Sequence, residues 1–168
     1  GYSGETLTSN NALIPIAYYL FTIKMPNNFI DSGTTKANRD KIKKWLIRSL
    51  LKKAFSGQPD NVLRPIRDII KANGKKEFPL DSIIDRFKGK NKSIQFTETD
   101  IDEFLLGLKY GKSDTLSTLM LLYPSLDFSN KFHEDHMYPK SKFTKAYLRK
   151  QGVPEDKLNW YIDTVNDI

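Results

Sequence analysis

Apolar residues recur at helical spacing along most of this chain, and this periodicity constrains the fold more than any other feature. The clearest case lies between Thr35 and Phe55, where one set of apolar residues shares a single helical face: Ile42, Trp45, Leu46, Leu50 and Ala54. Gly57 follows at a position suited to a helix C-terminus. The pattern predicts a helix that buries one face and exposes the other.

Similar patterns predict further helices along the chain. Their expected ranges are residues 8–24, 60–73, 80–88, 100–110, 114–122 and 144–151, and a last helix from Pro154 to the end. The first of these helices is mostly apolar, so we expect it to be buried despite Pro15. Gly74 is expected to cap the C-terminus of the helix over residues 60–73. Only Leu126 to His133 alternates as a strand does. The sequence therefore predicts a mainly α fold, with a helical bundle over residues 1–124.

Composition narrows the class of protein. The 168 residues, 39% of them hydrophobic, are enough for one globular domain of ordinary size. Twenty-seven basic residues against 20 acidic ones give a net charge of +7, which favours polyanionic partners such as nucleic acid. The longest apolar run, Ala12 to Phe21, is too short to span a bilayer, and no signal peptide is seen. We expect a cytoplasmic protein with no membrane partner.

The absence of cysteine restricts the possible chemistry. Without cysteine the chain has no disulfide, no cysteine-ligated zinc and no thiol nucleophile. Any metal ion must be held by oxygen and histidine ligands. A serine hydrolase is not indicated either, because no Gly-x-Ser-x-Gly turn occurs.

Two further motifs fail on spacing. The stretch from Gly107 to Ser113 has three residues between its glycines, whereas a P-loop has four and follows a strand. His133 and His136 are three residues apart, whereas the zinc proteases place their histidines four apart on a helix. These spacings argue against a P-loop and against a metalloprotease.

One face of the helix expected between Thr35 and Phe55 is basic. It consists of Lys41, Lys44, Arg48 and Lys52. One interpretation is contact with the nucleic-acid backbone, and the other is a solvated helix face.

The segment FHEDHMYPKSKF, residues 132–143, contains both histidines of the chain. His136 is suited to act as a general base and Asp135 to bind Mg²⁺, while Lys140 and Lys142 could meet a phosphate. Neighbouring residues of a strand point to opposite faces, so the strand must end for both side chains to reach one phosphate, and Pro139 favours that ending. A polar hairpin and a transition-metal site made by His133, Asp135 and His136 remain alternatives.

The same segment resembles a known family. Asp135-His136-Met-Tyr-Pro139-Lys-Ser-Lys-Phe143 is similar to the Asp-His-x-x-Pro-x-Ser-x-Phe signature of HNH, or His-Me finger, endonucleases, and more narrowly to the C-terminal nuclease region of GmrSD-type bacterial restriction proteins. A second stretch, Leu7 to Leu20, resembles the Asn-Asn-Ala-Leu-x-Pro helix that those proteins carry between their two catalytic parts.

The resemblance implies a DNA endonuclease that depends on Mg²⁺, or on a similar ion such as Mn²⁺, and that restricts phage or modified DNA. His136 would be the general base, Asp135 a metal ligand, and His133 an assisting residue at the phosphate or metal. Residues 125–168 would form the first strand and loop of a ββα-metal unit, after a helical connector over residues 1–124.

The chain departs from the family pattern in two places. In the family, the motif is followed by a second strand and by a helix that carries another metal ligand. An N-terminal ParB-like domain that uses a nucleotide comes before the helical connector. We therefore expect the full-length protein to be the enzyme and this chain alone to be inactive or nearly so. Asn166 is not taken as a ligand, because it precedes the expected second strand. The rival function is a non-catalytic helical module that binds nucleic acid or another partner.

Overall fold

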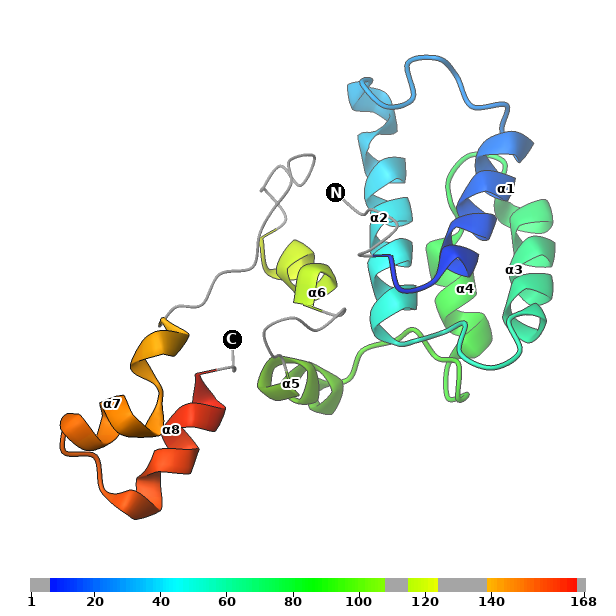
Figure 1. Cartoon of the computed structure of the whole chain (residues 1–168). Coiled ribbons are helices and arrows are strands. Elements are labelled where there is room, and N and C mark those ends of the chain that lie inside the picture. The colour runs from blue at the N-terminus through cyan, green and yellow to red at the C-terminus, as the bar shows by residue number, and fades with distance from the viewer. Residues whose placement is uncertain (1–6, 108–114, 124–138, 166–168) are drawn as a thin grey trace.

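The computed structural model describes residues 7–107, 115–123 and 139–165, which form eight α-helices and four 3₁₀ turns (Figure 1). The helices are α1 (Ile14–Thr22), α2 (Lys36–Leu51), α3 (Asp60–Asn73), α4 (Leu80–Phe87), α5 (Glu98–Gly107), α6 (Thr115–Leu122), α7 (Lys145–Lys150) and α8 (Leu158–Thr164). The turns are η1 (Asn10–Leu13), η2 (Gly33–Thr35), η3 (Lys140–Lys142) and η4 (Glu155–Lys157). The described part of the chain contains no strand, so the prediction of a mainly α fold is confirmed.

No ββα unit is seen among the described residues, and much of the segment expected to form it lies outside them. The predicted strand from Leu126 to His133 lies outside the described residues, as does the boundary between residues 124 and 125. What the structure describes of the C-terminal region begins at Pro139 and is helical.

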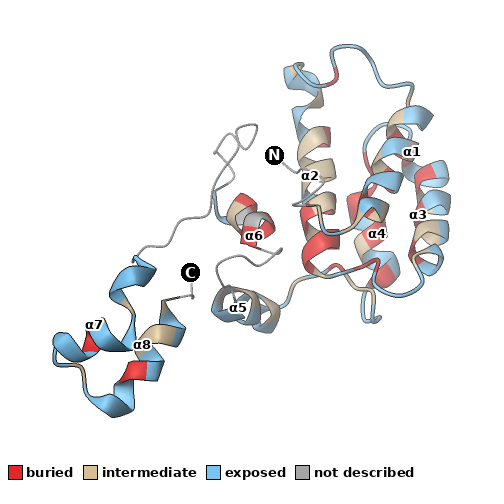
Figure 2. Ribbon diagram, viewed as in Figure 1, coloured by how far each residue is buried: buried red, intermediate tan, exposed pale blue. Residues whose placement is uncertain are grey.

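The main core is formed by α1 to α4 around Trp45, which is fully buried (Figure 2). The indole Nε1 of Trp45 donates a hydrogen bond to the carbonyl oxygen of Ala12 at 3.0 Å. The rings of Phe55 and Phe78 lie 6.1 and 6.0 Å from the Trp45 ring, and Tyr19 meets Phe78 edge-on at 5.3 Å. Because aromatic side chains bury large apolar areas, this cluster helps to hold α1 and α2 against the segment that precedes α4.

A buried amide ties these same elements together. Asn38 of α2 donates from Nδ2 to the hydroxyl of Tyr19 at 2.7 Å, and its Oδ1 accepts the backbone N–H of Phe78 at 2.9 Å. Burial raises the pKa of Tyr19, which keeps its hydroxyl neutral in this network. The bond to Phe78 also holds the preceding residue, Glu77, beside α2.

The prediction that the first helix is buried is only partly right. Ala12, Pro15 and Tyr19 are buried, but Ile14 is 48% exposed and Phe21 is 82% exposed. α1 packs mainly on α3 and on η1, and it also contacts α2 through the hydrogen bond between Tyr19 and Asn38. A nearly continuous apolar run does not distinguish burial of one side from burial of both.

The end of α2 also differs from the prediction. The helix stops at Leu51 instead of Phe55, and Gly57 lies in the loop beyond it. Lys53 takes a left-handed conformation with φ of 47°, its N–H donates to Leu50, and the N–H of Ala54 donates to Ser49. This is a Schellman ending with lysine where glycine is usual, so no glycine marks it in the sequence. Gly74, by contrast, caps α3 as predicted.

A smaller core joins α2 to α5 and α6. Ile47, Leu51 and Met120 are buried there, with Phe96 and Phe104 packed against them. α5 begins at Glu98, two residues before the predicted start. Within the described ranges, no helix has both the length and the apolarity to cross a membrane.

The last two helices pack on each other. Leu148 of α7 and Leu158 of α8 are the buried residues of this hairpin (Figure 2). α7 begins next to Thr144, whose hydroxyl accepts the N–H of Tyr147, so its predicted start is confirmed.

Candidate functional site

The three residues to which the resemblance assigns chemistry are not described by the structure. His133, Asp135 and His136 all lie within residues 124–138. The described chain resumes at Pro139, three residues after His136.

The backbone that follows the motif turns at once. Pro139 is extended, with φ of −61° and ψ of 121°, and caps η3. The N–H of Lys142 then donates to Pro139 at 2.9 Å, and the N–H of Phe143 donates to Lys140 at 2.9 Å. Thr144 next caps α7, so the chain runs from proline through a tight turn into a helix without any strand between them.

Lys140 and Lys142, the lysines expected to meet a phosphate, are both exposed in this turn. The ammonium group of Lys142 lies 4.8 Å from the centre of the Tyr147 ring, a cation–π contact that directs the side chain over α7. The surrounding stretch, residues 139–154, contains five basic residues and no acidic one: Lys140, Lys142, Lys145, Arg149 and Lys150. Arg149 is paired with Glu155 of η4 at 2.6 Å, so the positive charge of this stretch is partly neutralised.

The basic face of α2 is less available to an outside polyanion than the sequence suggests. It consists of Lys41, Lys44, Arg48 and Lys52. At its N-terminal half, the ammonium of Lys41 lies 2.6 Å from the Glu77 carboxylate. The hydrogen bond from Lys41 to Glu77 raises the pKa of the lysine. Of the two lysines in this half of the face, Lys41 is thus paired with an acid from the segment before α4, and Lys44 is exposed.

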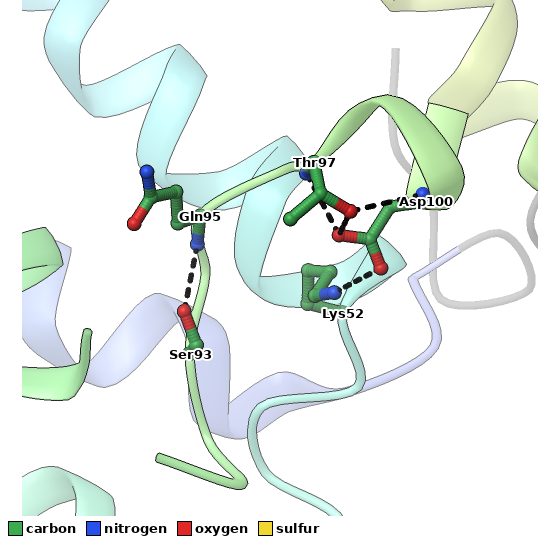
Figure 3. Close-up of polar contacts among 5 residues, drawn as sticks. All are labelled: Lys52, Ser93, Gln95, Thr97 and Asp100. Atoms are coloured by element: carbon green, nitrogen blue, oxygen red, sulfur yellow. Dashed lines mark hydrogen bonds and ion pairs between the residues drawn. The ribbon is translucent and has the colours of Figure 1, made fainter. Parts of the chain in front are cut away.

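At the C-terminal half, Lys52 joins a compact polar cluster at the start of α5 (Figure 3). Its Nζ donates to Oδ1 of Asp100 at 2.5 Å, and both side chains are only about one fifth exposed. The other Asp100 oxygen accepts the N–H and the hydroxyl of Thr97 at 2.8 and 2.9 Å, and the Asp100 N–H donates back to the Thr97 hydroxyl. Thr97 and Asp100 therefore form a capping box, and Lys52 binds its acid.

These contacts have an electrostatic consequence. The hydrogen bond from Lys52, assisted by those from Thr97, lowers the pKa of Asp100 to about 2. Arg48 and Lys52 also lie over the Phe96 ring, each 5.8 Å from its centre. Three of the four residues on the basic face of α2 thus have partners within the protein, which favours a structural role for them. A DNA contact by this face stays a prediction.

The candidate metal ligands lie in the segment from His133 to His136, outside the described residues. Among residues 7–107, 115–123 and 139–165, no group of three or more acidic or histidine side chains is arranged to hold a metal ion. Asp135 offers a hard carboxylate oxygen, the type of ligand that Mg²⁺ and Mn²⁺ prefer. The nitrogens of His133 and His136, if they acted as ligands, would suit a transition metal instead.

Comparison with known proteins adds no family to this description. No protein-family model matches the chain, and a search of curated proteins also gives no significant match.

Proposed function

We propose that this chain is part of a metal-dependent DNA endonuclease of the His-Me finger type, with His136 as the general base and Asp135 as a metal ligand. The observation that supports it is the stretch from Asp135 to Phe143, which has the residue types and spacing of the family signature. The second stretch, Leu7 to Leu20, occurs before it in the order found in the family.

The residue types suit phosphodiester hydrolysis. His136 would accept a proton from a water molecule as the water oxygen forms a bond to phosphorus and the bond to the leaving oxygen breaks. Asp135 would hold the divalent ion. That ion, when bound, would neutralise charge on the phosphate and assist the leaving oxygen. His133 would assist at the phosphate or metal, or would lie on the surface without a role in the reaction.

The described residues next to the motif support this proposal. Lys140 and Lys142 are exposed only a few residues after His136, in a stretch without acidic side chains, where a polyanion would be attracted. The tight turn after Pro139 is stabilised by the Thr144 cap and by burial of Leu148, so these lysines are held by local structure.

The family resemblance also motivates the biological part of the proposal. The full-length protein would restrict phage or modified DNA and would carry a ParB-like domain that uses a nucleotide.

The test is cleavage of plasmid DNA by the full-length protein with Mg²⁺ and with EDTA. We expect cleavage only with Mg²⁺, and a loss of at least about 100-fold in His136→Ala and in Asp135→Ala, because a positioned general base or a bound metal ion contributes at least that much. Asp156→Asn, an exposed acid in η4, is the matched control and should cleave normally. Wild-type activity in either substituted protein would reject the assignment. DNA binding without any metal-dependent cleavage would favour the non-catalytic module.

A further inference from the structure

A second basic region lies at the C-terminal end of α4 and in the turn after it. We call residues 86–92 the basic loop, since every second residue in it is cationic: Arg86, Lys88, Lys90 and Lys92. The turn is tight, because the N–H of Lys90 donates to Phe87 at 3.0 Å and Gly89 takes a φ of 70°. No acidic residue occurs between Arg86 and Thr97.

The charges of the basic loop are not neutralised within the described part of the chain. Arg86, Lys88 and Lys90 are exposed, and their side chains form no ion pair or hydrogen bond there. Lys92 is different, because its Nζ donates to the backbone oxygen and the hydroxyl of Ser56 at 2.6 and 2.8 Å. This anchor ties the loop to the segment after α2 without using an acid, so the positive charge remains.

The basic loop borders a shallow cavity of about 450 Å³ that is widely open to solvent and is lined by residues of α3, of the end of α4 and of the loop itself. Arg86, Lys90 and Lys92 line it together with Asn61 and Asn91, and Pro65 and Phe87 are its apolar residues. The amide nitrogen of Asn61 also donates to Oε1 of Gln58 at 3.2 Å. No carboxylate lines this cavity. Guanidinium, ammonium and amide groups are the donors that bind phosphate oxygens.

We infer that the basic loop and this cavity bind the phosphate backbone of duplex DNA. The inference rests on the proposed function for the choice of DNA among polyanions. The apolar residues next to the cations do not favour a membrane surface, because Phe87 is 6% exposed and Ile94 is 1% exposed, leaving no apolar side chain to insert. Contacts of this kind are independent of base sequence and steeply dependent on salt.

The test is binding of a fluorescently labelled DNA duplex to the 168-residue chain, measured by anisotropy in EDTA over a range of KCl concentrations. The variant combines Arg86→Gln, Lys88→Gln and Lys90→Gln. The control, Lys71→Gln with Lys75→Gln and Lys76→Gln, makes the same change in net charge with exposed residues at the other end of α3. Circular dichroism verifies that both variants fold.

We expect the loop variant to bind at least tenfold more weakly near 0.1 M salt. The slope of log K against log salt is negative, and its magnitude should decrease by up to about 2.7, which corresponds to three lost phosphate contacts. The control should keep most of its slope. An unchanged slope in the loop variant, or an equal loss in both variants, would overturn the inference. Lost binding to phosphatidylserine vesicles with DNA binding unchanged would also overturn it, in favour of a membrane surface.

Because EDTA removes metal-dependent cleavage, this result is independent of the nuclease proposal. A loop variant with normal DNA binding rejects the binding surface and leaves the nuclease proposal standing. Conversely, a full-length protein that binds DNA through the loop but never cleaves it rejects the nuclease proposal alone.

Discussion

The basic face of α2 and the basic loop carry four cationic residues each, yet their surroundings differ. On α2, Lys41 and Lys52 are paired with Glu77 and Asp100. In the loop, Arg86, Lys88 and Lys90 have no such partner among the described residues. Similar positive patches can therefore either hold a fold together or stay open to a polyanion, and the position of acidic side chains in space decides which.

The pairing on α2 depends on the core beneath it. Asn38 holds the backbone of Phe78, and this bond keeps Glu77 next to Lys41. The capping box at the start of α5 similarly orients Asp100 toward Lys52. Substitution of Asn38 or of Asp100 should therefore weaken the fold around α2. Substitution of a residue of the same type in or beside the basic loop should not.

The largest effect is expected for Asn38→Ala. This change leaves the N–H of Phe78 and the Tyr19 hydroxyl without their buried partner, which should reduce the free energy of unfolding by about 2–3 kcal/mol. Asn91→Ala, an exposed amide in the basic loop, is the control and should change it by less than about 0.5 kcal/mol. Urea unfolding followed by circular dichroism measures both. Equal effects would mean that the Asn38 network does not support α2.

A smaller loss is expected for Asp100→Ala, which removes both the capping partner of Thr97 and the ion pair with Lys52. The expected decrease in stability is about 1–2 kcal/mol. Asp85→Ala, an exposed acid next to the basic loop, should lie within about 0.5 kcal/mol of the wild type in the same unfolding measurement. A wild-type stability for Asp100→Ala would show that the contacts of Asp100 with Lys52 and Thr97 do not stabilise the fold around α2.

The smallest effect concerns pH. The pKa of Asp100 is lowered from 3.8 to about 2 in the folded protein, so its contribution to stability is fully present above about pH 4 and is lost as the pH falls through about 2. NMR titration of the Asp100 carboxyl carbon should show this low value. In Lys52→Gln the pKa should move up toward 3.8, because the strongest donor is removed. A titration near 3.8 in the wild type would contradict the ion pair.

The sequence predicted much of the fold because helical periodicity is a local property. The positions of α3, α4, α6 and α7 follow from apolar spacing and from caps such as Gly74 and Thr144. The end of α2 was missed because Lys53 occupies a left-handed position where glycine is expected.

The candidate site was harder to predict. The pairs Lys41–Glu77 and Lys52–Asp100 join residues 36 and 48 positions apart, so the neutralised charge of α2 is visible only in the folded chain. Helical periodicity does not indicate the basic loop, because its lysines alternate around Gly89 instead of recurring at helical spacing. The feature of the sequence that indicates the basic loop is a run of cationic residues with no acidic residue among them.

The nuclease proposal is tested most directly by the single-turnover rate of DNA cleavage at saturating full-length protein, comparing the wild type with His136→Ala in Mg²⁺. We expect a rate at least about 100-fold lower in His136→Ala, with DNA affinity in EDTA unchanged, because only proton transfer is removed. A rate within about twofold of the wild type would contradict the proposal that His136 is the general base.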